Sequence, residues 1–185
     1  MDGVKDTWII KQLEIKNQIS DKDCSLVLTE DEHWKYVGGL DISFIVGDDV
    51  NACACYVILD RDLQVVYKNV KMVQMTAPYI PGFLAFREAD SLLQLIDQQK
   101  TQSPQLTPDV LIVDGNGVLH PRQCGIACHI GVETGIPSIG VAKNLHQIQE
   151  LGDDFSRESV KRRFNDLSDD SQVLNLKTSE VIKIY

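Results

Sequence analysis

The sequence predicts an α/β fold built on one mixed sheet, an antiparallel three-strand meander plus parallel strands, flanked by helices. Three strand patterns joined by short links, at residues 36–46, 53–59 and 63–73, predict the antiparallel meander. After them, strands at 110–113 and 138–142 alternate with helical patterns. Strands that alternate with helices predict parallel pairing through right-handed crossovers.

The segments around these strands are predicted as follows. Apolar residues at helical spacing indicate a helix over residues 5–20. Residues 76–82 exclude regular strand pairing, because two prolines and a glycine interrupt them. A helix follows at 83–99, and another near 122–134 is stopped by Gly135.

The C-terminal part gives a weaker pattern. Residues 160–164 are compatible with a helix, whose basic residues 161–163 are best read as a solvated face. Residues 173–176 and 181–185 are predicted to form a hairpin. Because its second strand stops at the last residue, we expect more chain normally to follow.

Size, composition and charge narrow the class of protein. A chain of 185 residues with 43% hydrophobic and 24% charged residues fits one globular domain, which we expect over 1–185. No apolar run reaches the roughly 20 residues that cross a membrane, and the first residues lack a signal-peptide pattern, so we expect an intracellular protein. The net charge of −9 argues against a simple cationic nucleic-acid binder, but not against a nuclease whose carboxylates bind divalent cations.

Three acidic residues stand where a carboxylate is unusual. Asp41 lies mid-strand, where β-propensity disfavours aspartate, although a solvated sheet face accounts for it equally well. Glu88 lies on the apolar stripe of its helix, where an unpaired charge is costly. Asp114 ends a buried strand, at the sheet edge where α/β proteins bind ligands. If the three converge, their oxygen atoms suit Mg²⁺ or Mn²⁺.

The residues after Asp114 favour a phosphate site. Gly115 and Gly117 allow a close backbone approach, and His120 stands where the third glycine of a dinucleotide fingerprint should fall, which rules that motif out. Lys143 follows the last predicted strand and is either a solvated lysine or a phosphate contact. The stiff Pro-Tyr-Ile-Pro segment at 78–81 either caps the core or inserts an aromatic tip among bases.

Five cysteines, an odd number, argue against a closed disulfide framework. Cys53 and Cys55 share a strand face, and Cys124 and Cys128 lie one helical turn apart, close to two histidines. Their spacing matches no standard zinc pattern, so we favour small buried thiols over a zinc site.

Four segments, taken together and in this order, resemble the endonuclease V family of inosine-specific nucleases. They read VGGLDISF (37–44), TAPYIPGFLAFRE (76–88), VDGNGVLHPR (113–122) and GVAK (140–143). Residues 124–131 resemble the eukaryotic form. The resemblance implies an RNase H-like fold. It also implies hydrolysis of the second phosphodiester bond 3′ to inosine in RNA or deoxyinosine in DNA, with Mg²⁺ as cofactor and Mn²⁺ as a substitute.

Carried over by matching position, the resemblance implies roles for individual residues. Asp41 and Asp114 are metal ligands, and Asp41, Glu88, Asp114 and Lys143 are catalytic. Tyr79 is the tip that separates bases. The residues implied to bind substrate are Pro78, Tyr79, Ile80, Pro81, Leu84, Arg87, Gly115, Asn116, Gly117, His120, Gly125 and Ile126. We expect a monomer that binds inosine-containing RNA and deoxyinosine-containing DNA in the cytoplasm, with the nucleus and nucleolus as further locations.

The sequence departs from the family at its end. Family members continue past this C-terminus with a strand and a helix that carry a histidine near the metal, and no histidine here lies beyond His146. A second hypothesis is therefore a truncated, catalytically impaired form that still binds inosine-containing nucleic acid.

Overall fold

The computed structural model describes residues 2–20 and 34–142, which contain one five-stranded sheet in the order β3-β2-β1-β4-β5. Strands β1 to β3 are antiparallel, and β4 pairs in parallel with both β1 and β5. This is the predicted mixed sheet of an antiparallel meander extended by parallel strands. The elements are α1 Asp2–Lys16, β1 Val37–Phe44, β2 Asn51–Leu59, β3 Val65–Gln74, α2 Ala85–Gln102, η1 Pro104–Leu106, β4 Val110–Asp114, α3 Ile126–Thr134 and β5 Ser138–Val141.

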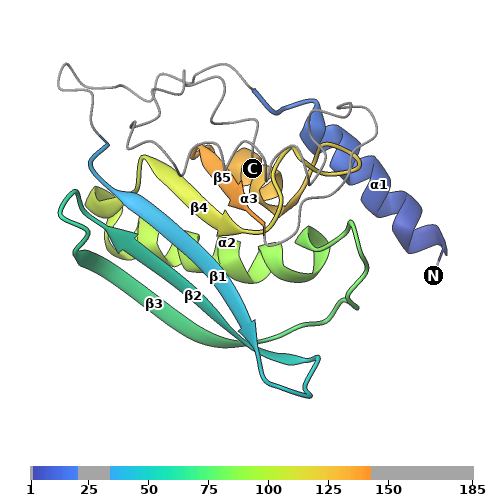
Figure 1. The fold of residues 1–185 in the computed structure, drawn as a ribbon, viewed down its shortest axis with the longest axis horizontal. Helices are drawn as coiled ribbons and strands as arrows, with labels where there is room; N and C mark the ends of the chain where they lie inside the picture. Colours follow the sequence, from blue (N-terminus) through green and yellow to red (C-terminus); the bar gives the residue numbers. More distant parts are fainter. Residues whose placement is uncertain (1, 21–33, 143–185) are drawn as a thin grey trace, which may run out of the picture.

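The core lies between one face of the sheet and the helices α2 and α3 (Figure 1). Strand β2 alternates between buried and half-buried residues, as a strand with one covered face should. Its buried Tyr56 packs in one cluster with Leu95 of α2, Leu111 of β4 and Ile130 of α3. Each large apolar side chain buried in this way contributes about 1.5–3 kcal/mol to the free energy of folding.

Helix α1 packs beside α3, where Ile15 is fully buried against Cys124 and Cys128. It ends at Lys16, four residues before its predicted end. The amides of Gln18 and Ile19 bond to carbonyls three residues back, which tightens the chain into a turn.

One predicted strand ends earlier and one predicted helix begins later in the structure, in both cases because of local hydrogen bonds. The first strand stops at Phe44, because a carboxylate oxygen of Asp48 accepts the N–H groups of Val50 and Asn51 and closes a turn. Helix α3 begins at Ile126, because the amide of Gly125 is bonded to the loop after β4. The helix predicted at 83–99 runs from Ala85 to Gln102.

The predicted helix at 160–164 and the hairpin of 173–176 and 181–185 lie outside the described residues. Within residues 2–20 and 34–142, no helix has the length and apolar character needed to cross a bilayer.

Candidate active site at the carboxyl ends of β1 and β4

Two of the predicted carboxylates lie next to each other on neighbouring parallel strands. Leu40 of β1 pairs with Val113 of β4, and Asp41 and Asp114 are the next residue of each strand. Residues at equivalent positions of parallel strands point to the same face of the sheet. Asp41 is exposed and accepts a 3.2 Å hydrogen bond from the Ser43 hydroxyl, whereas Asp114 is half-buried. One exposed and one half-buried carboxylate therefore lie side by side at the edge where α/β sheets bind ligands.

Glu88, the third predicted acid, lies on the buried side of α2 with only 9% of its surface exposed. As predicted, it shares the apolar stripe of Leu92 and Leu95. Burial raises the pKa of Glu88 to about 7. The Arg87 guanidinium acts in the opposite direction, and the carboxylates of Asp114 and Asp41 raise the pKa further. The structure thus brings the three acids within electrostatic reach of one another.

The donor atoms at this edge suit a hard divalent cation. Asp41 and Asp114 offer only oxygen, which Mg²⁺ and Mn²⁺ prefer, and Mg²⁺ is commonly bound through one or two carboxylates plus water and substrate oxygens. Two adjacent carboxylates meet that need. Within the described part of the chain, no three His, Cys, Asp or Glu side chains are arranged as a ready-made metal site. Lys143, predicted at the same edge, lies outside the described residues.

Six of the predicted substrate-binding residues gather around the glycine loop, which we define as residues 115–117. Gly115 has a φ of +134°, and a β-carbon there would collide with Ile126 and contact Leu84. The carbonyl of Asn116 accepts the amide of Ala127, and the carbonyl of Gly117 accepts the amide of Gly125. The six residues are Leu84, Gly115, Asn116, Gly117, Gly125 and Ile126.

The glycine loop is held between two backbones. Gly125 lies against it on one side and Gly140 on the other, and a β-carbon at either position would overlap the main chain of the loop. The Asn116 side chain donates a 2.8 Å hydrogen bond to the carbonyl of Leu119, which closes the turn. These contacts fix the course of the loop from β4 to α3.

The other predicted substrate-binding residues belong to, or hold, the segment that we call the proline loop, residues 76–82. Its tip is open to solvent, and Tyr79 is 66% exposed. Pro78 and Pro81 are also exposed, whereas Ile80 is half-buried. A large aromatic ring that is exposed at the tip of a loop is available for contact with a partner.

Arg87 and His120 hold the two ends of the proline loop. The Arg87 guanidinium donates to the carbonyls of Ala77 and Asp49 and lies over the Phe44 ring, 5.1 Å from its centroid. His120 is buried, with its Nε2 atom 3.0 Å from the carbonyl oxygen of Gly82. Both side chains therefore contact main-chain carbonyls near the two ends of the loop.

The cysteines of the described residues are free thiols. Burial raises the pKa of Cys124 to about 12 and that of Cys128 to about 11, so both remain protonated at neutral pH. Cys53 and Cys55 are half-buried and share one face of β2, as predicted. Of the small buried thiols that were predicted, Cys124 and Cys128 are buried.

Two buried polar residues near the site were not predicted. Gln12 of α1 is 1% exposed, and His129 of α3 is 5% exposed with its ring edge on Phe86. Burial lowers the pKa of His129 to about 4. Their only signal in the sequence is a polar residue among the apolar positions of a helix, and α1 was expected to bury only its apolar stripe.

The sequence of this chain is similar to known proteins of one family. The family model of endonuclease V matches residues 15–182. A curated endonuclease V from Homo sapiens is 47% identical over 154 residues, which are 78% of this chain and 52% of that protein. The mouse protein is 45% identical over 147 residues, 78% of this chain and 44% of that protein. This chain therefore spans about half the length of the curated relatives it matches.

The fold is similar to solved structures of endonuclease V. The catalytic domain of human endonuclease V superposes with a TM-score of 0.80 at 41% identity, covering 88% of this chain and 66% of that one. An endonuclease V from Ciona intestinalis, solved with a 23mer DNA containing an inosine followed by a ribo-adenosine, gives a TM-score of 0.79 at 36% identity. That match covers 93% of this chain and 70% of the Ciona chain. The fold is therefore RNase H-like, as predicted, and the chain belongs to the endonuclease V family.

Proposed function

We propose that this protein is a metal-dependent endonuclease that hydrolyses the second phosphodiester bond 3′ to inosine in RNA, and to deoxyinosine in DNA. The observation that carries the proposal is that Asp41 and Asp114 adjoin each other on β1 and β4, with Glu88 within electrostatic reach of both. Membership of the family supports it, as does the inosine-containing DNA bound by the Ciona relative.

The reaction is the attack of water on phosphorus. A new P–O bond forms, the bond from phosphorus to the 3′ oxygen breaks, and the products are a 3′-hydroxyl and a 5′-phosphate. Asp41 and Asp114 would hold Mg²⁺, or Mn²⁺ in its place, and such an ion supplies positive charge that stabilises the transferring phosphate and makes a bound water more acidic.

Glu88 suits the proton transfer of this reaction. A general base works best when its pKa lies near the working pH, and burial raises the pKa of Glu88 to about 7. In its ionised form the carboxylate accepts a proton from the attacking water. Its electrostatic interaction with Asp114 and Asp41 supports this role, because a phosphate held by a cation at those two residues would lie near Glu88.

Recognition of inosine is assigned to the two loops. Tyr79, at the tip of the proline loop, enters the space that the extracted base leaves and restores part of the lost stacking. The glycine loop reads the extracted base. The carbonyls of Asn116 and Gly117 already accept hydrogen bonds from the amides of Ala127 and Gly125, and the amide of Gly115 donates to the carbonyl of Val141. The N–H groups of Asn116 and Gly117 are therefore the donors that we assign to the base, where they suit the hypoxanthine carbonyl and reject the amine of adenine.

A matched set of RNAs tests the proposal. Three labelled oligonucleotides differ only at one position, which holds inosine, guanosine or adenosine, and each is incubated with Mg²⁺ or Mn²⁺. We expect cleavage of the inosine RNA alone, at the second phosphodiester bond on the 3′ side of the inosine. Equal cleavage of all three would refute base recognition, and cleavage that persists in EDTA would refute metal dependence.

A second candidate is a protein that binds inosine-containing nucleic acid without cutting it. It is favoured by one observation, that the described residues offer two adjacent carboxylates but no set of three metal ligands. Binding measured by fluorescence anisotropy on the same three RNAs separates the two candidates. Selective binding of the inosine RNA with no product after long incubation would establish the second one.

Three further properties stay predictions: a single domain over residues 1–185, a monomer in solution, and a location in the cytoplasm with the nucleus and nucleolus in addition. Sedimentation of the purified protein tests the monomer, limited proteolysis tests the domain, and imaging of the tagged protein tests the location.

A further inference from the structure

The side chain of Gln12 ties helix α1 to two loops that lie far away in the sequence. Its Nε2 atom donates hydrogen bonds of 3.1 Å to the carbonyls of Gly82 and Cys124. Its Oε1 atom accepts a 2.5 Å hydrogen bond from Nε of Arg122. Both N–H groups and the oxygen of the amide are therefore used, which fixes its orientation at a site with 1% exposure.

The carbonyl of Gly82 is where these bonds act on the proline loop. It accepts from Gln12 and from the Arg122 guanidinium, and His120 Nε2 lies 3.0 Å away. Gly82 ends the loop with a φ of +79°, a conformation that favours glycine. These three contacts around one carbonyl fix the plane of that peptide, and with it the direction in which the chain leaves the loop.

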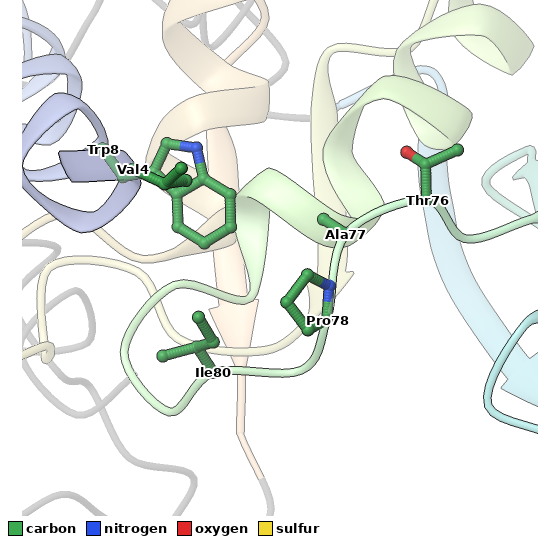
Figure 2. A pocket seen from close by; sticks show the side chains of 6 residues that line it. All are labelled: Val4, Trp8, Thr76, Ala77, Pro78 and Ile80. Carbon is green, nitrogen blue, oxygen red and sulfur yellow. The ribbon is translucent and has the colours of Figure 1, made fainter. Parts of the chain in front are cut away.

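Helix α1 also lies near the proline loop through Val4 and Trp8. Trp8 stacks on Phe86 of α2, with ring centroids 4.8 Å apart and planes 4° apart. Figure 2 shows Val4 and Trp8 of α1 facing the proline loop across an apolar pocket. The pocket, of about 330 Å³, is lined by Val4, Trp8, Thr76, Ala77, Pro78 and Ile80. Because this space is open, the loop has room to shift toward α1, and hydrogen bonds at its end are needed to hold it.

We propose that Gln12 is a positioning residue that holds the proline loop in the conformation seen here and so directs Tyr79 toward the nucleic acid. This role rests on the proposed function, in which Tyr79 enters the base stack. Gln12 lies before residue 15, where the match to the family model begins. Tyr79 is 66% exposed, so its direction is set by the backbone of its loop and not by packing of its own ring.

Two variants test this role, so that the test does not depend on the folding of a single variant. Gln12→Ala removes all three hydrogen bonds, and Gln12→Glu keeps an acceptor for Arg122 but loses both donors to the carbonyls. Glu14→Ala, at an exposed position of the same helix, is the matched control. The first readout is hydrogen exchange at the amide of Phe83, which donates a 2.9 Å hydrogen bond to Ile80 across the proline loop.

In both Gln12 variants we expect this amide to exchange at least about tenfold faster, since at least two hydrogen bonds of ordinary net strength are lost. Amides in the centre of β2 should keep their rates, and Glu14→Ala should match the wild type throughout. The second readout is kinetic. With inosine RNA and Mn²⁺, KM should rise about tenfold while kcat stays within about twofold, because the loop acts in docking and not at the phosphate.

Unchanged exchange at Phe83 in Gln12→Glu, or an equal fall in kcat and kcat/KM, would overturn the proposal and leave Gln12 as a folding residue. The exchange measurement needs no substrate. If the wild type neither binds nor cleaves inosine RNA, the proposed function fails, while the exchange rates still decide whether Gln12 holds the loop.

Discussion

The amide of Gly125 donates a 2.9 Å hydrogen bond to the carbonyl oxygen of Gly117. The residue that precedes α3 therefore lies directly against the glycine loop. Its φ of −86° is open to any residue, so glycine is required here by the close contact and not by the backbone angle.

We expect Gly125→Ala to damage base selection. The added β-carbon would overlap the Asn116 carbonyl, so the glycine loop must move. Overpacking of this kind costs about 1–3 kcal/mol. The ratio of cleavage rates on inosine and guanosine RNA should fall at least about tenfold. Gly3→Ala, whose β-carbon would meet nothing within 4 Å, is the control. A wild-type ratio in Gly125→Ala would mean that the glycine loop takes no part in selection.

Asp41→Asn should abolish cleavage and leave the protein folded. The amide has nearly the shape of the carboxylate, and the position is exposed, so the free energy of unfolding should change by less than about 1 kcal/mol. Binding of Mn²⁺, followed by electron paramagnetic resonance, should weaken in parallel. Asp62→Asn, at an exposed turn, is the control. Full metal affinity in Asp41→Asn would remove Asp41 from the metal site.

Glu88→Gln should stabilise the metal-free protein at alkaline pH while it abolishes cleavage. Burial raises the pKa of Glu88 from 4.5 to about 7 in the folded protein. Between these values the unfolded chain is ionised and the folded one is not, so wild-type stability falls as the pH rises from about 4.5 to 7 and then levels off. The glutamine variant lacks this loss, which amounts to about 3 kcal/mol at most.

Urea unfolding in EDTA, at pH 4.5 and at pH 8.5, measures this effect. The variant should gain stability relative to the wild type only at the higher pH. Asp90→Asn, at an exposed position of the same helix, should change stability by less than about 0.5 kcal/mol. A constant difference between Glu88→Gln and the wild type at both pH values would contradict a buried, protonated Glu88.

Tyr79→Ala should weaken productive binding of inosine RNA by about 1–3 kcal/mol, the value of one base stacked on an aromatic ring. The stability of the protein should hardly change, because Tyr79 is 66% exposed. Tyr79→Phe is the matched control and should bind normally, since the ring is what stacks. If affinity and rate are both unchanged in Tyr79→Ala, the proline loop has a structural role only.

Much of this architecture follows from patterns that act over short stretches of chain. Alternating residues in β2 predict a strand with one covered face, and Glu88 is predicted to be buried because its neighbours one helical turn away are apolar. The pairing of Asp41 with the position of Asp114 follows once β1 and β4 are taken as parallel neighbours.

Contacts between distant segments were not predictable in this way. The hydrogen bond from Gln12 to Gly82 spans 70 residues, and nothing at residue 12 or at residue 82 specifies the other. The early ends of α1 and β1 are each set by two hydrogen bonds in the turns that follow them. Such bonds are worth about 1 kcal/mol each, which moves an element boundary without changing the fold.

The side chains that hold the proline loop bond to main-chain oxygens, at Ala77 through Arg87 and at Gly82 through Gln12, His120 and Arg122. Main-chain carbonyls are present whatever side chain a residue carries. The residues between these two anchors can therefore be exchanged without removing a bond that holds the loop. The side chains at the tip can therefore vary while the anchored ends of the loop stay in place. Libraries at positions 79 and 80 offer a direct way to change which bases the protein tolerates.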